Sequence, residues 1–247
     1  MTQNFRFDTA FEEQAARTPG DVALHSLDGT ITYAELDERA NRVANYVRAA
    51  GIPSGAFVGL YVDRSIDTVA AILGILKVDG AVVPLPPSWP ADRVTEILRH
   101  ARLDAVIDAA ATPLTTDTGT RTLRLEDALR ADTAARASVE RGGSDSPAFV
   151  ICSSGSTGTP KMIVRSHRSF LHRLQWTWEQ HPYSADDVCV QKSFQATTHA
   201  VYELFEPLLR GVAVRIVPDE SLRDLANFWD LLADEGATRL LVVPSML

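Results

Sequence analysis

The chain has 247 residues, of which 45% are hydrophobic and 23% are charged, and it carries a formal net charge of −8. This composition is typical of a soluble globular protein, and the acidic balance argues against a nucleic-acid binder or a membrane-surface binder. No apolar run reaches the roughly 18 residues of a membrane-spanning helix, and residues 1–20 lack the apolar core of a secretory signal. We therefore expect no nucleic-acid or membrane partner and a cytoplasmic location.

The first half of the chain alternates between strand-like and helical patterns. Apolar residues at helical spacing predict helices at 7–18, 33–50, 67–77 and 92–101. Short apolar runs predict strands at 22–25, 30–32, 57–62, 80–84 and 105–107, the first two joined by a turn at Asp28 and Gly29. Thr32 and Glu35 have the spacing of a capping box at the start of the second helix. The alternation predicts an α/β fold with mostly parallel strands.

The second half repeats these patterns after two polar stretches. Segments 112–120 and 131–146 are polar or rich in Ala, Ser, Arg and Gly, and we expect surface linkers without catalytic residues. Further on, the patterns predict strands at 148–152, 162–165, 188–191, 212–217 and 238–244, and helices at 170–179, 200–209 and 222–233. Ser166 is placed to cap the helix at 170–179. Cys152 and Cys189 lie in apolar runs, which predicts small buried side chains and neither a disulfide framework nor a metal site.

The most informative segment runs from Ser153 to Lys161, reads SSGSTGTPK and follows the apolar run 148–152. Gly155 and Gly158 allow backbone N–H groups to turn toward an anion, and the hydroxyl side chains add uncharged donors. Lys161 supplies a mobile positive charge that can follow a phosphate. The spacing differs from the Walker pattern, and Ser/Gly/Thr clusters also occur in flexible linkers. The order of the residues and the Pro-Lys ending favour a loop that binds a polyphosphate.

The run SSGSTGTPK resembles the phosphate-binding signature of the AMP-forming adenylate synthetases. This superfamily includes the adenylation domains of nonribosomal peptide synthetases, acyl- and aryl-CoA synthetases, and firefly-type luciferases. Further segments resemble family patterns in the family's order: 27–36 resembles LTYxEL, 76–85 resembles LKAGxxYVPLD, and 194–209 resembles the pocket segment FDxSVWEIF. Together these segments cover nearly the whole chain, and the peptide-synthetase branch is the most similar.

The resemblance implies that ATP activates a carboxylic acid or amino acid as an acyl-adenylate, with release of pyrophosphate, in nonribosomal peptide-type biosynthesis. The acyl group then passes to the phosphopantetheine thiol of a carrier protein, and Mg²⁺ accompanies the nucleotide. The resemblance assigns nucleotide binding to Ser153, Ser154, Gly155, Ser156, Thr157, Gly158, Thr159 and Lys161. Lys161 is also the candidate catalytic residue, because its charge would act at the leaving pyrophosphate or hold the loop closed.

The resemblance also implies a fold and its extent. Residues 1–247 correspond to the N-terminal portion of the layered αβα large domain of an adenylate-forming enzyme. The later subdomain and the mobile C-terminal domain, with its own catalytic lysine, have no counterpart in these residues. We therefore expect an AMP-forming acid–thiol ligase only as part of a complete domain, and no turnover by this chain alone. The alternatives are an acyl- or aryl-CoA ligase and a non-catalytic half-domain that binds a partner.

The segment that resembles the acyl pocket departs from the family pattern. The peptide-synthetase pattern has an aspartate five residues before the pocket glutamate, where it pairs with the α-ammonium of an amino acid. Here the glutamate is Glu203, Thr198 takes the place of the aspartate, and residues 192–202 contain no acid. A buried ammonium without an opposing charge is strongly destabilised. Either another group meets the ammonium, or the substrate lacks an ordinary α-amine, as aryl acids, hydroxy acids and amino acids with a displaced amine do.

The residues assigned to substrate binding are Thr197, Thr198, His199 and Glu203. A slip of one residue in the alignment would bring His199 to the place of the aspartate, where a neutral imidazole can accept a hydrogen bond. Glu203 either touches the nucleotide side of the site or anchors its helix by hydrogen bonding.

Other residues near these motifs are expected to be structural. His167 and His172 lie behind the phosphate loop, and Lys192 is expected to be a solvated or loop-anchoring charge. Packing roles are expected for Trp176, Trp178 and Tyr183, with the alternative that one of them borders the acyl site.

Overall fold

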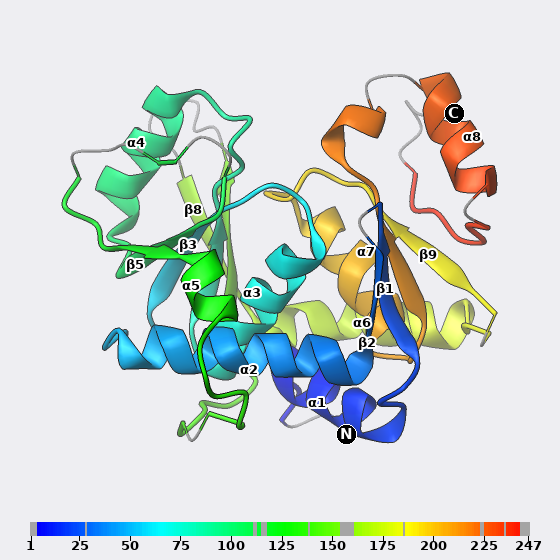
Figure 1. Ribbon diagram of the computed structural model, residues 1–247, viewed down its shortest axis with the longest axis horizontal. Coiled ribbons are helices and arrows are strands. Elements are labelled where there is room, and N and C mark those ends of the chain that lie inside the picture. The colour runs from blue at the N-terminus through cyan, green and yellow to red at the C-terminus, as the bar shows by residue number, and fades with distance from the viewer. Residues whose placement is uncertain are drawn as a thin grey trace.

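The computed structural model describes residues 4–27, 29–110, 113–114, 118–137, 139–153, 161–184, 186–222, 225–234 and 236–242. These residues form two β-sheets that stand side by side, with helices packed around and between them (Figure 1). The long helix α2 (Tyr33–Ala49) runs along the base of the view below the sheets. This arrangement confirms the predicted layered α/β fold with mostly parallel strands.

The first sheet has the strand order β6-β5-β3-β4-β7-β8 in the described residues. Its strands are β3 (Phe57–Tyr61), β4 (Ala81–Pro84), β5 (Ala105–Asp108), β6 (Thr122–Arg124), β7 (Pro147–Ser153) and β8 (Lys161–Ser166). All neighbours pair in parallel except β7 and β8, which form an antiparallel hairpin at one edge. The parallel strands therefore share a carboxyl edge, which is where open α/β sheets bind ligands.

The second sheet has the strand order β2-β1-β10-β9. Its strands are β1 (Val22–Ser26), β2 (Gly29–Thr32), β9 (Val188–Gln191) and β10 (Ala213–Ile216). The hairpin of β1 and β2 is antiparallel, while β10 pairs in parallel with both β1 and β9. The sheet therefore joins the first strand of the chain to strands that come more than 150 residues later.

Helices connect these strands and cover the sheets. Besides α2, they are α1 (Phe7–Arg17), α3 (Ile66–Lys77), α4 (Ala91–Ala101), α5 (Leu125–Leu129), α6 (His167–Gln180), α7 (Thr198–Leu208), α8 (Leu225–Asp234) and the 3-10 helix η1 (Asp219–Leu222). Helix α2 starts with the predicted capping box, because the Thr32 N–H donates to Glu35 Oε2 at 2.9 Å and the Glu35 N–H donates to Thr32 Oγ1 at 3.3 Å. Gly51 follows the helix with a φ of 74°, a left-handed conformation that suits glycine.

One continuous apolar core joins the two sheets. Phe7 of α1 lies within it, with its ring centroid 5.7 Å from that of Phe149 in β7 and 4.5 Å from that of Phe205 in α7. All three rings are buried, and full burial of one such side chain stabilises a fold by about 1.5–3 kcal/mol. At the crossing of α2 and α3, a Cβ added to Gly74 would lie 2.6 Å from the Cβ of Val43. This close helix contact therefore requires glycine.

The structure confirms most of the predicted helices and strands to within two residues of their ends. The sequence patterns do not predict β6 or α5, which follow the polar stretch 112–120. The short strand β6 is held by its parallel pairing with β5, and this long-range contact leaves no periodic signal in three residues. Part of 112–120 lies outside the described residues. Cys152 and Cys189 are buried free thiols, as predicted.

Three predictions for individual segments need correction. Segment 131–146 is not simply a surface linker, because Ala137 and Ser144 are buried and Arg141 is ion paired with Glu12. Helix α6 begins at His167, earlier than predicted, and the Ser166 side chain makes no capping hydrogen bond. In the described residues, the predicted strand 238–244 is represented only by a bridge between Arg239 and Cys189.

Candidate functional site

The phosphate signature connects the two strands of the β7–β8 hairpin. The last residue pair of this ladder is Ser153 with Lys161, so the two ends of the signature lie opposite each other. Strand β7 also pairs in parallel with β4, which places the start of the signature at the carboxyl edge of the first sheet. The Lys161 residue is exposed at the start of β8. The predicted nucleotide-binding residues from Ser154 to Thr159 lie outside the described residues.

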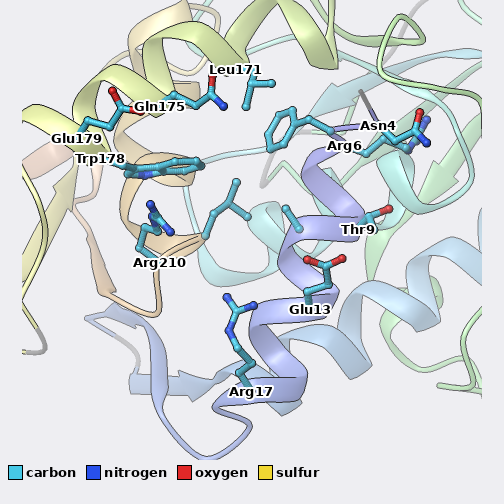
Figure 2. Close-up of a pocket in the computed structure, with 13 residues that line it drawn as sticks. Asn4, Arg6, Thr9, Glu13, Arg17, Leu171, Gln175, Trp178, Glu179 and Arg210 are labelled. Carbon is cyan, nitrogen blue, oxygen red and sulfur yellow. The ribbon is translucent and has the colours of Figure 1, made fainter. Parts of the chain in front are cut away.

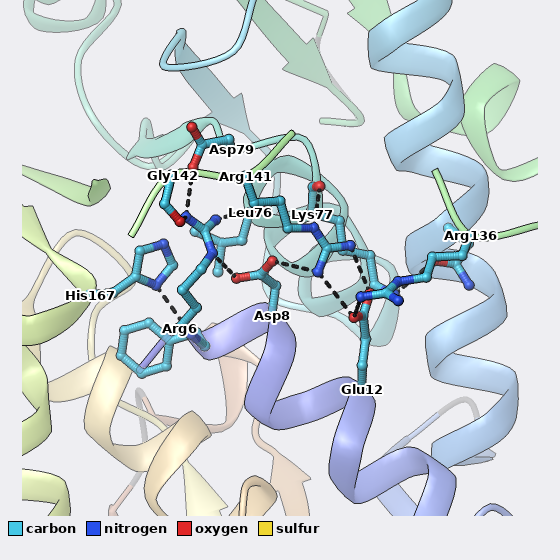
Figure 3. Close-up of polar contacts among 12 residues, drawn as sticks. Arg6, Asp8, Glu12, Leu76, Lys77, Asp79, Arg136, Arg141, Gly142 and His167 are labelled. Carbon is cyan, nitrogen blue, oxygen red and sulfur yellow. Dashed lines mark hydrogen bonds and ion pairs between the residues drawn. The ribbon is translucent and has the colours of Figure 1, made fainter. Parts of the chain in front are cut away.

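A buried polar cluster supports the base of this hairpin (Figure 3). His167 directly follows β8, and its Nδ1 accepts a hydrogen bond from the Phe7 N–H at 3.1 Å. Burial, reinforced by the nearby Arg6 guanidinium, lowers the pKa of His167 to about 3, so the imidazole is neutral. The backbone N–H of His167 also donates to the Ser146 carbonyl at 3.2 Å, next to the start of β7. The predicted structural role of His167 fits these contacts, whereas His172 is exposed.

Arg6 joins three segments of the chain within the same cluster, through four residues. Its guanidinium donates to Asp8 at 3.0 Å, to Asp79 at 2.6 Å, and to the carbonyl oxygens of Leu76 and Gly142, both at 3.1 Å. Burial raises the pKa of Asp8 despite this contact. The N-terminus of α1, the end of α3 and the segment that enters β7 are therefore connected through one buried cation.

Lys77 and Arg141 form the other half of the cluster, around Glu12. Lys77 is fully buried, and its ammonium donates to Glu12 at 2.9 Å, to Asp37 at 2.7 Å and to Asn41 at 2.7 Å. Arg141 donates to both carboxylate oxygens of Glu12 at 2.9 and 3.0 Å. Burial opposes the ionisation of Glu12, but the hydrogen bonds and charges of Arg141 and Lys77 outweigh it and lower its pKa to about 2. The supposed linker 131–146 is thus ion paired to α1.

The segment that resembles the acyl pocket leaves the carboxyl end of β9 and enters α7. Thr197 caps the helix: its Oγ1 accepts from the Ala200 N–H at 3.4 Å and donates to the Phe194 carbonyl at 2.7 Å. The next two residues begin the helix, with Thr198 half-buried and His199 exposed. Phe194 is partly exposed and its ring lies 5.9 Å from that of Trp89, which precedes α4. The structure therefore brings Thr197, Thr198 and His199 together at one helix start.

Glu203 lies one to two turns further along α7 and is buried. Its Oε2 accepts from the backbone N–H groups of Lys192 and Ser193 at 2.9 and 2.7 Å. Its Oε1 accepts from Ser193 Oγ at 2.7 Å and lies 3.5 Å from Lys192 Nζ. Lys192 is only 6% exposed, so the solvated alternative for this residue is wrong. Sequence reasoning missed Ser193, whose place two residues after the end of β9 was the only available signal.

Two open grooves flank helix α6. One, of about 500 Å³, lies between α1 and α6 and has Phe5, Leu171 and Leu209 among its lining residues (Figure 2). Trp178 borders this groove, with the Arg210 guanidinium 4.4 Å from its ring centroid. The other, of about 560 Å³, is lined by α6, α7, β9 and residues 238–241, including Trp176, Tyr183 and Glu203. Trp176 and Tyr183 therefore border a groove that reaches α7, the helix of the segment that resembles the acyl pocket, and Trp178 does not.

The described residues contain no cluster of three or more His, Cys, Asp or Glu side chains that could hold a metal ion. Within the same part of the chain, no helix is both long enough and apolar enough to cross a membrane.

Comparison with models of protein families shows to which family this chain belongs. The family model of the AMP-binding enzyme matches residues 11–247. The chain belongs to the AMP-binding enzyme family. It is 34% identical over 238 residues to tyrocidine synthase 3 of Brevibacillus parabrevis, which covers 96% of this chain and 4% of that protein. It is 32% identical to zwittermicin A synthase ZmaJ of Bacillus cereus, covering 96% of this chain and 45% of ZmaJ.

Solved structures of family members agree with this assignment. The AMPPNP-bound form of the nonribosomal peptide synthetase FmoA3 superposes with a TM-score of 0.91 at 27% identity, covering 100% of this chain and 26% of FmoA3. The N-terminal subdomain of Klebsiella oxytoca NpsA, in complex with 3-hydroxybenzoyl-AMSN, superposes with a TM-score of 0.87 at 25% identity. That match covers 98% of this chain and 60% of the NpsA chain. The resemblance to AMP-binding adenylation domains of peptide synthetases is thus confirmed, and the chain spans less than half the length of the curated relatives named above.

Proposed function

We propose that this chain is the N-terminal part of an adenylation domain that activates a carboxylic acid with ATP and passes the acyl group to a carrier protein. Family membership supports an adenylate-forming reaction. Similarity to peptide synthetases supports the phosphopantetheine thiol of a carrier protein, rather than free coenzyme A, as the acceptor. Turnover is proposed for a complete domain, because this chain spans 45% of ZmaJ and 38% of the syringomycin synthase SyrB1 of Pseudomonas syringae.

The observation that carries the proposal is the place of the phosphate signature in the fold. Ser153 and Lys161 pair across the β7–β8 hairpin, so the intervening SGSTGTP run starts and ends at the carboxyl edge of the parallel strands. The donors of residues 153–161 are amides, hydroxyls and the ammonium of Lys161, a set that fits a polyphosphate and holds no competing acid. Mg²⁺ would be held mainly by the nucleotide phosphates.

The proposed chemistry asks the chain mainly to position two anions. When bound, ATP supplies the α-phosphorus to which a carboxylate oxygen of the substrate bonds as the bond to pyrophosphate breaks. Residues 153–159 would hold the β- and γ-phosphates through their amides and hydroxyls. Lys161 would neutralise charge that builds up on the departing pyrophosphate, an effect that is strongest in the transition state.

For the substrate, we propose a carboxylic acid without an ordinary α-ammonium group. Thr198 and His199 stand at the start of α7, and no acid lies between Gln191 and Glu203. Thr197 is occupied as the helix cap, so it would contribute mainly its backbone. Structural relatives include an NpsA complex with a 3-hydroxybenzoyl group and an FmoA3 complex with α-methyl-L-serine-AMP. Fold similarity alone is therefore compatible with either kind of acid, and the proposal depends on position 198.

The experiment is a pyrophosphate-exchange screen with the longest natural protein that contains these residues, over proteinogenic amino acids, aryl acids, hydroxy acids and β-amino acids. We expect an acid without an α-amine, or with a displaced amine, to give the highest rate. Thr198→Asp should shift the preference toward common α-amino acids. Lys161→Ala should slow adenylate formation more than it weakens acid binding. A clear preference for a standard L-α-amino acid would overturn the substrate proposal, and no exchange with any acid would overturn the adenylation proposal.

The acceptor and the extent of the protein need separate measurements. Transfer of the acyl group to a phosphopantetheinylated carrier protein, compared with coenzyme A at equal concentration, decides between the two thiols. Mass spectrometry of the native protein decides between a complete adenylation protein and a half-domain of 27.0 kDa. A native mass of 27.0 kDa would favour a split protein or a non-catalytic partner-binding protein.

A further inference from the structure

Glu203 uses its whole carboxylate within the protein. An ionised carboxylate offers about four acceptor sites. Those of Glu203 face two backbone N–H groups, one hydroxyl and one ammonium, contributed by Lys192 and Ser193. The carboxylate is also buried, with 1% of its side chain exposed. No acceptor site is therefore left over for a substrate or a nucleotide.

The contacts of Glu203 connect the acyl helix to the end of the strand before it. Lys192 and Ser193 are the first residues after β9, and Glu203 lies in the second turn of α7. Between these points the chain passes through residues 192–197, which we call the β9–α7 loop. The loop leads directly into Thr198, so its path sets where the first residues of α7 stand.

Other contacts fix the middle and the end of the same loop. The Gln195 side-chain amide, oriented to satisfy its neighbours, donates to the Val62 carbonyl at 3.2 Å and accepts from the Arg64 N–H at 2.8 Å. Thr197 closes the last turn through the Phe194 carbonyl. These two anchors are neutral, whereas the Glu203 anchor is charged, and hydrogen bonds to charged groups are the stronger ones.

Lys192 and the backbone N–H groups contribute differently to this anchor. The backbone N–H groups approach the carboxylate to 2.7–2.9 Å, but the ammonium stays 3.5 Å away, beyond the usual distance of a charge-assisted hydrogen bond. Glu203 is the only partner of Lys192 Nζ that the described residues provide. The lysine therefore balances the buried charge, while the amides and the Ser193 hydroxyl fix the geometry.

We propose that Glu203 is a positioning residue that clamps the β9–α7 loop and thereby sets the acyl-binding end of α7. It acts through Lys192 and Ser193 and touches neither the acid nor the nucleotide. Its loss should loosen the loop and disturb the binding of the carboxylic acid. The phosphate signature belongs to the other sheet, between β7 and β8, so nucleotide binding should change little.

Amide hydrogen exchange on the 247-residue chain, read residue by residue by NMR, tests the clamp without any activity. In Glu203→Met, exchange of the Lys192 and Ser193 amides should accelerate at least about tenfold, as expected for losing a hydrogen bond to a charged group. Glu203→Gln should have an intermediate effect, because its amide has one acceptor oxygen for the four donor groups that face the carboxylate. This variant carries the test if the methionine variant fails to fold.

Glu206→Met is the matched control. Glu206 lies on the same helix, is buried to a similar degree, and accepts from Thr177 Oγ1 without touching the β9–α7 loop. The Glu206→Met variant should leave the exchange rates of the Lys192 and Ser193 backbone amides unchanged. The clamp is overturned if both amides keep their wild-type exchange rates in the Glu203 variants, or if the Glu206 control accelerates them equally.

A kinetic measurement, which rests on the proposed function, separates positioning from catalysis. In an adenylation protein that carries these residues, Glu203→Gln should raise KM for the carboxylic acid about tenfold while KM for ATP stays within about twofold. A fall in kcat with both KM values unchanged would contradict the positioning role. If the wild-type protein shows no exchange with any acid, the proposed function fails, while the hydrogen-exchange result still decides the clamp.

Discussion

Lys77 and Lys192 are both buried lysines, but they hold opposite places in their clusters. Lys77 is the centre of its cluster, with three oxygen partners at 2.7–2.9 Å. Lys192 stands at the margin of its cluster, 3.5 Å from a carboxylate that is itself the centre. In the first cluster a cation holds acids from two helices together, and in the second an acid holds backbone N–H groups. The importance of a buried charge therefore depends on how many other groups it satisfies.

The largest effect expected from this comparison is that of Lys77→Met. The change leaves Asp37 and Asn41 without their ammonium partner and takes one of three cationic partners from Glu12, which keeps Arg141 and the exposed Arg136. Removing one partner of a buried ion pair typically lowers the free energy of unfolding by about 3–5 kcal/mol. Urea denaturation followed by circular dichroism measures this loss. Arg136→Met is the control, because Arg136 also contacts Glu12 but is 66% exposed and should matter by less than about 1 kcal/mol.

A smaller effect is expected from Lys192→Met. Glu203 keeps two backbone N–H groups and the Ser193 hydroxyl, so the expected loss is about 1–2 kcal/mol. The same denaturation experiment measures it. In the double variant Lys192→Met/Glu203→Met the losses should not add, because no buried charge then remains unpaired. If Lys192→Met lowered the unfolding free energy as much as Lys77→Met, the proposed difference between the two lysines would be wrong.

The third effect is confined to acid pH. Glu12 has a pKa near 2 in the folded protein against an ordinary 4.5, so its contribution to stability is complete above pH 4.5 and is lost as the pH falls toward 2. Glu12→Gln should flatten the pH dependence of the unfolding free energy in that window by up to about 1.4 kcal/mol per pH unit. Asp8 and Glu206 have raised pKa values in the folded protein. Their contributions to the pH dependence of the unfolding free energy therefore have the opposite sign to that of Glu12. In Glu206→Gln, the unfolding free energy should therefore fall at least as steeply at acid pH as it does in the wild-type protein.

The sequence was sufficient for features that depend on neighbouring residues. The capping box of Thr32 and Glu35, the hairpin at 22–32 and most helix ends are local, and the structure confirms them. The family assignment also rested on contiguous motifs, and the comparison with known proteins confirms it. The nucleotide-binding role of residues 153–161 and the substrate role of Thr198 and His199 remain predictions.

Features that depend on distant partners could not be read from the sequence. Arg141 sits in a stretch with the composition of a linker, but its partner Glu12 lies 129 residues away. Lys192 gave no sign of burial, because the carboxylate that balances it belongs to the following helix. Ser166 has the right residue type and place for a helix cap, yet α6 begins without its side chain. Hydrophobic periodicity indicates which face of a helix or strand is apolar, but it does not indicate which charged side chains form ion pairs.

The pairing of β1 with β10 has a consequence for synthesis of the protein on the ribosome. Leu24 pairs with Val214, so the hairpin of β1 and β2 is made roughly 190 residues before its neighbouring strand exists. Translation adds roughly 5–20 residues per second. For about 10–40 s, the backbone N–H and C=O groups of β1 that face β10 in the folded protein therefore have no partner strand. An isolated two-stranded hairpin is marginally stable in water. The second sheet therefore completes late, and during that interval the nascent chain depends on shielding of this edge against pairing with other chains.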